Sequence, residues 1–227
     1  MKIYTKTGDK GTSSLYSGER VSKASRIFNV LGEVDRLNCD LGFVRSYAKH
    51  ECVSGIRGIQ SLLISIGSCI GTRPSNRKRY EQTRLTQLDD ETKALEEQID
   101  EWTGKIPPLR TFLTPGDSEH SNRVHAARTT CRGLERLLVA LCDDTKNEIV
   151  DIQNSIDDGK KILDGDNKDS IQSEINDMVK LYDDTVTLLD DLKEISKYVN
   201  RLSDYLFTLA RYIEEYVEKE GWGWRLL

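Results

Sequence analysis

The chain has 227 residues, of which 37% are hydrophobic and 31% are charged, and it carries a formal net charge of −5. This composition is typical of an ordered globular protein. A chain of this length can bury a substantial core as one large domain or two small ones. The acidic balance argues against a nucleic-acid partner, because nucleic-acid-binding domains normally carry an excess of Lys and Arg.

The amino terminus runs directly into MKIYTKTGDKG, without the apolar core of a signal peptide or the composition of a transit segment. We expect a cytoplasmic protein, or a mitochondrial matrix protein if a presequence has been removed. The longest mostly apolar stretch, around Leu62 to Ile70, is far shorter than the roughly 20 residues of a membrane span, so we expect no membrane segment. The five cysteines form no C-x-x-C pair, and the three histidines have no metal-ligand spacing. These patterns argue against a disulfide framework and a zinc site, and they identify no metal ligand.

Apolar residues recur every three or four positions in five windows, which predicts helices with one buried face. In chain order these windows span residues 27–44, 56–70, 88–102, 124–141 and 195–213. Pro107-Pro108 and Pro115-Gly116 enclose a short extended segment between the third and fourth windows. The pattern predicts an all-α protein with at least five helices in a single domain, residues 1–227.

Residues 143–194 differ in composition from the rest of the chain. They hold sixteen Asp or Glu and six Lys or Arg, a net charge of −10, whereas the other 175 residues carry a net +5. Two amphipathic patterns, at 149–163 and 171–189, flank Gly165-Asp166-Asn167 and predict an antiparallel acidic helical hairpin inserted into the bundle or extending it. We favour a solvated excursion without a function of its own, with a partner-binding arm as the alternative.

Residues 5–14 read TKTGDKGTSS and could present backbone N–H groups, hydroxyls and ammonium groups to phosphate. The segment is not a Walker A motif, because no Lys-Ser/Thr follows the second glycine at the required place. On composition alone, a surface turn is the simpler interpretation.

A helical face with Arg128, Arg132, Glu135 and neighbouring Arg136 is the second polar feature. Like charges four residues apart on a helix repel each other, so a partner should neutralise them. Salt bridges to neighbouring helices would do so. A polyphosphate is the alternative, because guanidinium groups bind phosphate oxygens in a bidentate manner.

Three separated blocks resemble the ATP:cob(I)alamin adenosyltransferases of the propanediol-utilisation type. They are TKTGDKGTSS with Gly18-Glu19-Arg20 and Lys23; FLTPG (112–116) followed by HAARTTCRGLER (125–136); and NRLSDYLFTLARY (200–212). The resemblance implies a ferritin-like five-helix bundle that forms a homotrimer with ATP in the clefts between subunits. It also implies that residues 1–24 are a nucleotide-binding segment.

The resemblance further implies the roles of individual residues. The ATP site would comprise Thr5, Lys6, Thr7, Gly8, Ser13, Ser14, Lys23, Arg132, Glu135, Arg136 and Asn200. The residues assigned to catalysis are Arg132, Arg128 and Asp35, of which Arg128 and Asp35 would pair across a subunit boundary. Phe112 would bind cobalamin by closing the lower face of the corrin.

In this family, Co(I) attacks the ribose 5′ carbon of ATP, which gives adenosylcobalamin and expels triphosphate in the presence of Mg²⁺. Cobalt is the nucleophile, so no activated Ser, Cys or His is required. The implied partners are a flavin-type reductase and an adenosylcobalamin-dependent mutase.

The chain departs from the family pattern at Gly133, where a second arginine is usual, and at Leu134 and Thr114. We nevertheless expect an active enzyme, because the other arginines remain. The alternatives are a non-catalytic carrier of cobalamin or ATP, and a helical interaction protein that acts through the acidic hairpin.

Overall fold

The computed structural model describes residues 4, 6–47, 51–116, 118–161 and 168–217. Within these ranges it contains the helices α1 (Arg26–Tyr47), α2 (Ile56–Ile70), α3 (Arg77–Thr83), α4 (Leu88–Thr103), α5 (Glu119–Lys161) and α6 (Lys168–Tyr212). A 3-10 turn (Glu51–Val53) precedes α2, and a π-helical turn (Ile213–Val217) follows α6. The strands β1 (Thr12–Ser14) and β2 (Arg20–Ser22) form a two-stranded antiparallel sheet.

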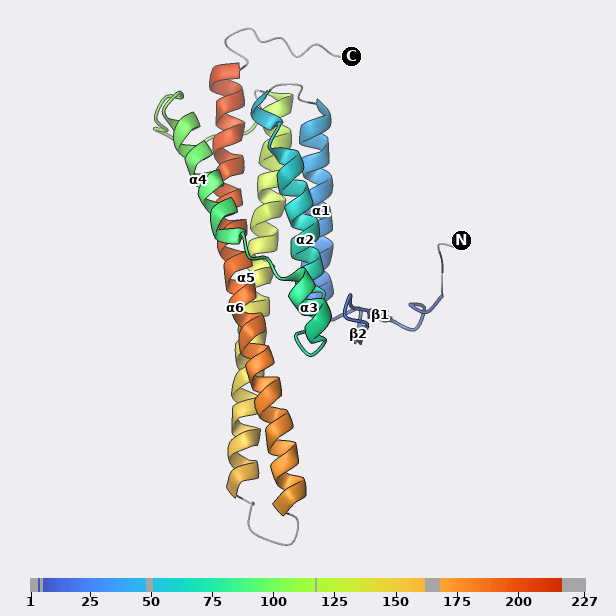
Figure 1. Cartoon of the computed structure of the whole chain (residues 1–227). Helices are drawn as coiled ribbons and strands as arrows, with labels where there is room; N and C mark the ends of the chain where they lie inside the picture. The colour runs from blue at the N-terminus through green and yellow to red at the C-terminus, as the bar shows by residue number, and fades with distance from the viewer. Residues whose placement is uncertain (1–3, 5, 48–50, 117, 162–167, 218–227) are drawn as a thin grey trace.

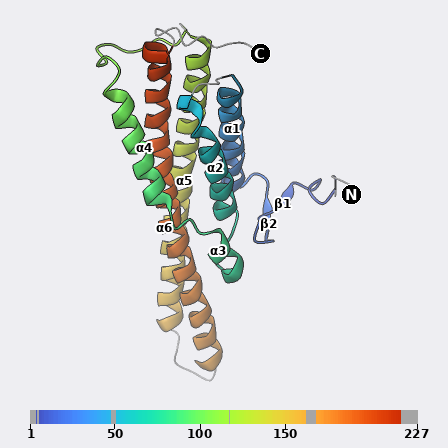
Figure 2. The ribbon, with the colours of Figure 1, turned by 45° about the horizontal axis from the view of Figure 1, so that its top comes forward.

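The long helices run alongside one another as a bundle, with α4 on the outer side of α6 (Figure 1). The far ends of α5 and α6 continue beyond the bundle as a two-helix arm, and the turned view shows the same arrangement (Figure 2). The expectation of an all-α protein with at least five helices is confirmed.

The core lies where the apolar faces of the bundle helices meet. Its largest fully buried side chains include Leu37 and Leu41 of α1, Leu63 and Ile66 of α2, Leu134 and Leu138 of α5, and Ile195 and Leu202 of α6. These residues belong to the apolar stripes in the sequence, because a 3.6-residue period places them on one side of each helix.

Helix α3 was not predicted from the sequence. It has seven residues and buries one side chain, Tyr80, so it shows no apolar period. Polar contacts attach it to α6 instead: the Tyr80 hydroxyl donates to Asp191, and the Arg84 guanidinium donates to both oxygens of the same carboxylate, at 3.1 and 3.2 Å.

The acidic span does not form separate helices. Residues 143–161 are the far end of α5, and residues 168–194 are the first part of α6. The division into separate helices was wrong because charged residues interrupt the apolar stripe at 143–148 while the backbone continues as a helix. A small cluster formed by Ile152, Ile156 and Ile175 joins the two helices in the arm. The turn expected at Gly165-Asp166-Asn167 lies outside the described residues.

One described segment, Glu51–Ile70, has the length and the mean hydropathy, 1.4, of a membrane span. At 20 residues it is longer than the stretch from Leu62 to Ile70 expected from the sequence. Ile56, Ile59, Leu63 and Ile66 of this segment are buried in the core, so packing within the bundle accounts for its apolar character.

Candidate active site

Arg20 organises the N-terminal segment from β2. Its Nη2 donates to the backbone oxygen of Thr7 at 2.7 Å and to that of Thr12 at 3.2 Å. Its Nη1 donates to the Ser14 hydroxyl at 3.4 Å. The turn at residues 6–10 is therefore held against the sheet by one guanidinium group, which the sequence analysis had noted only as part of a motif.

Gly8 and Lys23 meet in this segment. A Cβ at position 8 would lie 3.0 Å from Lys23 Nζ, so the glycine leaves room for the ammonium group. The backbone N–H of Lys23 donates to the oxygen of Gly11 at 2.9 Å. Lys6 adopts a left-handed conformation, with φ of 59°. The structure thus brings the expected residues from Lys6 to Lys23 into one small unit, whereas Thr5 lies outside the described residues.

On α5, the arginines of the predicted face have no carboxylate partner among the residues that the structure describes. Arg128, Arg132 and Arg136 form no ion pair with any residue in the described ranges. Arg201 on α6 differs, because Glu96 at 2.9 Å and Asp204 at 2.6 Å neutralise it. Salt bridges within the described part of the chain therefore do not offset the charge of the α5 face.

Glu135 and Asn200 are brought together across the α5–α6 interface. The Asn200 amide donates to Glu135 Oε1 at 2.7 Å. The two residues are 65 positions apart in the sequence, and their contact places the polar part of α6 beside the arginine face of α5.

Arg128 and Asp35 form no ion pair in the described part of this chain. The Arg128 guanidinium carbon lies 5.8 Å from the centre of the Phe207 ring, and its Nε is buried without a hydrogen-bond partner. Asp35 is exposed on α1. The expected pairing across a subunit boundary stays a prediction.

His125 lies one turn before Arg128 on α5 and was not assigned a site role from the sequence. Its ring is buried, both ring nitrogens lack a hydrogen-bond partner, and Phe207 lies 6.3 Å away between ring centres. Burial, with a smaller contribution from the charge of Arg128, lowers the pKa of His125. The i, i+3 spacing to Arg128 was the signal in the sequence that could have identified it.

Phe112 is completely exposed, with a relative accessibility of 101%. It lies in the segment between α4 and α5, where Leu109 and Leu113 are also exposed. An aromatic side chain that its own chain leaves uncovered is a candidate contact for a ligand or another subunit.

The N-terminal unit and the α5–α6 face are separate within one chain. Both views show the N-terminal segment projecting away from the bundle (Figures 1 and 2). Arg20 binds the backbone oxygens of Thr7 and Thr12, and the N–H of Lys23 donates to Gly11, so these hydrogen bonds tie the segment to its own β-hairpin. One copy of the chain therefore presents the two halves of the expected ATP site in different places.

Comparison with known families matches residues 3–158 to the model described as cobalamin adenosyltransferase. The chain belongs to this family. The family expected from the three sequence blocks is therefore confirmed, and so is the enzyme class, corrinoid adenosyltransferase.

Characterised members of the family align with much of the chain. The corrinoid adenosyltransferase MMAB of Bos taurus is 34% identical over 162 residues, which are 69% of this chain and 67% of that protein. The Homo sapiens protein of the same name is 35% identical over 143 residues, which are 62% of this chain and 57% of that protein. PduO of Citrobacter freundii is 38% identical over 145 residues, which are 62% of this chain and 42% of that protein. The chain thus spans less than two thirds of the human and Citrobacter proteins.

Solved structures of a PduO-type ATP:corrinoid adenosyltransferase from Lactobacillus reuteri share this fold. A phenylalanine-to-histidine variant, complexed with cobalamin and ATP, is 25% identical with a TM-score of 0.67, and the match covers 96% of this chain and 93% of that chain. An arginine-to-lysine variant complexed with ATP is 26% identical with a TM-score of 0.66. The family fold expected from the sequence is therefore confirmed.

Proposed function

We propose that this chain transfers the 5′-deoxyadenosyl group of ATP to the Co(I) centre of cobalamin. The lone pair on cobalt forms the bond to the ribose 5′ carbon while the C5′–O bond breaks, and its electrons leave with triphosphate. The observation that carries this proposal is the α5 face, where the guanidinium groups of Arg128, Arg132 and Arg136 have no acidic partner in the described ranges. The type of reaction is inferred from the family to which the chain belongs.

In this mechanism Arg132 and Arg136 bind the triphosphate and stabilise the charge that develops on it as the C5′–O bond breaks. The hydrogen bond between Asn200 and Glu135 fixes the carboxylate beside these arginines, where it can accept a hydrogen bond from the nucleoside. The protein thus works by placing the 5′ carbon and by binding the leaving group.

The N-terminal unit contributes the other side of the triphosphate site. Its Lys6 and Lys23 ammonium groups, the hydroxyls of Thr5, Thr7, Ser13 and Ser14, and the backbone at Gly8 offer donors to phosphate oxygens. Gly8 is important here because its missing side chain lets Lys23 approach the turn.

A homotrimer would unite the two halves of the site. Within one chain the N-terminal unit projects away from the bundle, so a neighbouring subunit can supply it to the α5–α6 face. The same arrangement would give Arg128 its carboxylate partner, Asp35, from another copy. Phe112 would cover the lower face of the corrin, which agrees with its full exposure in the single chain.

Mg²⁺ is proposed to enter with ATP. No group of three or more His, Cys, Asp or Glu side chains in the described ranges is arranged to hold a metal ion. Phosphate oxygens and water would therefore be the main ligands, as is common for Mg²⁺ bound with nucleotides.

The proposal extends to the surroundings of the enzyme. A flavin-type reductase would supply reduced cobalamin, and an adenosylcobalamin-dependent mutase would receive the product, in the cytoplasm or the mitochondrial matrix. We also propose that residues 143–194 are an insertion in the family bundle, which is supported by the end of the family match at residue 158, within this acidic span.

An anaerobic assay tests the activity. Chemically reduced cobalamin and Mg-ATP should yield adenosylcobalamin and triphosphate in equal amounts. A non-catalytic carrier is the second candidate, favoured by the Glu33 carboxylate that lies at Gly133, beside the arginine face. Tight binding of ATP and cobalamin without an adenosyl product would support the carrier and contradict the enzyme.

A further inference from the structure

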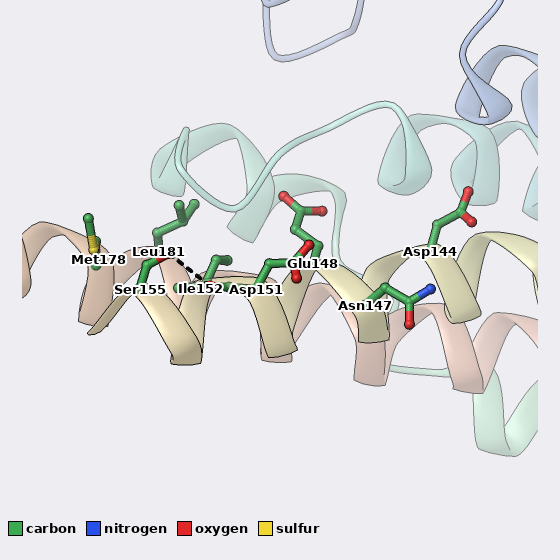
Figure 3. A pocket seen from close by; sticks show the side chains of 8 residues that line it. All are labelled: Asp144, Asn147, Glu148, Asp151, Ile152, Ser155, Met178 and Leu181. Carbon is green, nitrogen blue, oxygen red and sulfur yellow. Dashed lines mark hydrogen bonds between the residues drawn. The ribbon is translucent and has the colours of Figure 1, made fainter. Parts of the chain in front are cut away.

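The two-helix arm carries an open groove of about 520 Å³ between α5 and α6. Its lining residues are Asp144, Asn147, Glu148, Asp151, Ile152 and Ser155 from α5 and Met178 and Leu181 from α6. Figure 3 shows the α5 side chains in a row along one side of the helix, with Leu181 and Met178 coming from the neighbouring helix. The groove therefore has an apolar floor and an acidic edge.

The acidic edge is largely uncompensated. Asp144 pairs with Arg26 of α1 at 2.5 Å. Glu148 and Asp151 form no ion pair with residues in the described part of the chain, and neither does Asp184 across the groove on α6. Carboxylates at i and i+3 on one helix face repel each other, so a cationic partner would relieve this repulsion.

Part of the apolar floor also holds the arm together, because Ile152 belongs to the buried cluster between the two helices and Met178 packs against it. Ile152, Ile156 and Ile175 form the buried contact between the two helices. Leu181 lies outside this contact and remains 45% exposed, with the partly buried Met178 one turn before it. Leu181 is therefore the part of the floor that the contact between the two arm helices does not require.

A second cavity, of about 290 Å³, continues the groove toward the bundle. The two cavities share Glu148 and Leu181, and the second also reaches Arg73 and Glu19, whose charged groups lie 3.7 Å apart. Glu19 directly precedes β2 in the N-terminal unit. The two cavities together thus run from the arm to the base of the segment assigned to ATP.

We propose that this groove is the docking site of a basic amphipathic helix from a partner protein. The apolar face of that helix would cover Leu181 and Met178, and Lys or Arg on its flanks would pair with Glu148, Asp151 and Asp184. Charge complementarity selects this occupant, because residues 143–194 carry −10 while the rest of the chain carries +5. Helix-in-groove recognition is a common mode for an apolar groove with charged edges. The inference does not depend on the adenosyltransferase mechanism.

The binding preference of the groove can be probed with a display library of helical peptides whose sequences carry no bias in charge. We expect selection on the full-length protein to enrich peptides with one apolar face flanked by Lys or Arg. Binding of an enriched peptide should fall at least tenfold for the triple variant Glu148→Gln, Asp151→Asn, Asp184→Asn and for Leu181→Ser. It should also weaken as salt rises, because exposed charge pairs are screened.

The matched control removes the same charge from the same arm outside the groove, with Asp169→Asn, Glu174→Gln and Asp177→Asn. These three side chains are exposed and do not line the groove. The control should bind the peptide within twofold of the parent, and both triple variants should keep adenosyl transfer. The proposal is overturned if no peptide is enriched, if acidic peptides are enriched, or if both triple variants bind equally.

The occupant of the groove could instead be a second copy of the chain. Sedimentation of the parent and of the groove variant tests this by comparing the sizes of their assemblies. A smaller assembly for the groove variant alone would assign the groove to self-association and would also overturn the proposal. Assemblies of equal size for the parent and the groove variant, together with loss of peptide binding by the groove variant, support the proposal.

Discussion

The carboxylate of Glu33 on α1 lies against Gly133 on α5, where a Cβ would stand 2.6 Å from Glu33 Oε1. The side chain of Glu33 is only 20% exposed, and Arg36 approaches it at 3.9 Å. Gly133 is the position at which the family resemblance would place a second arginine. The glycine and the glutamate therefore form one unit, in which the carboxylate occupies the space that a larger residue at 133 would need.

The first prediction concerns this pair. Replacing a helical glycine with alanine stabilises a helix by about 1 kcal/mol, but in the parent chain Gly133→Ala must also displace Glu33. We expect the full gain in the free energy of unfolding only when Glu33→Ala is present as well. Urea unfolding of the two single variants and the double variant measures the coupling. Equal gains in both backgrounds would show that the contact has no energetic effect.

The second prediction concerns Arg132. Arg132→Ala removes an exposed charge that has no acidic partner in the described ranges, so the stability of the protein should change little. If the guanidinium binds triphosphate, kcat/KM for ATP should fall by about 10- to 100-fold, which corresponds to about 1.5–3 kcal/mol for a charged hydrogen bond. Arg77→Ala is the control, because Arg77 on α3 is exposed and pairs with Glu81 of the same helix, at 3.6 Å. Unchanged kinetics in Arg132→Ala would remove it from the site.

The third prediction separates binding from folding at Phe112. Because the side chain is fully exposed, Phe112→Ala should change the free energy of unfolding by less than about 0.5 kcal/mol. We expect the rate of adenosyl transfer to drop while ATP binding is retained, since the proposed contact is with the corrin. Leu109→Ala, at another exposed position of the same segment, should leave the rate near that of the parent. A large loss of stability in Phe112→Ala would instead assign the residue to the protein core.

The fourth prediction is a pH dependence of stability that arises from His125. Its pKa is lowered from 6.5 in the folded protein, so the unfolded chain takes up a proton first as pH decreases. The free energy of unfolding should therefore fall as pH goes from about 7.5 to 5.5, by about 1.4 kcal/mol for each unit of pKa difference.

Urea unfolding at several pH values measures this effect. His125→Gln should lose less stability on acidification than the parent, whereas His120→Gln should follow the parent. Identical pH dependence in His125→Gln and the parent would mean that another group controls the transition.

Local sequence patterns predicted most of the helices because helical amphipathicity is encoded within three or four residues. The stripe from Ile56 to Ile70 is a continuous example, and α2 has the same bounds. The pattern failed at α3, where a hydrogen bond from Tyr80 to Asp191, 111 positions away, replaces an apolar face. It also failed at residues 143–148, where charge interrupts the stripe but not the helix.

The sequence by itself determined the bundle helices, because helical amphipathicity is a local period, and it indicated the family through three motif blocks whose resemblance also implies the residues of the proposed ATP site. Only the tertiary structure decided that Glu135 meets Asn200, that Glu33 fills the space at Gly133, and that the α5 arginines form no ion pair in the described ranges. It also decided that the described parts of the acidic span continue two core helices, with a groove between them. These features arise from contacts between separate helices, such as Glu135 with Asn200, 65 positions apart, and Glu33 with Gly133, and no local pattern records how separate helices align their side chains.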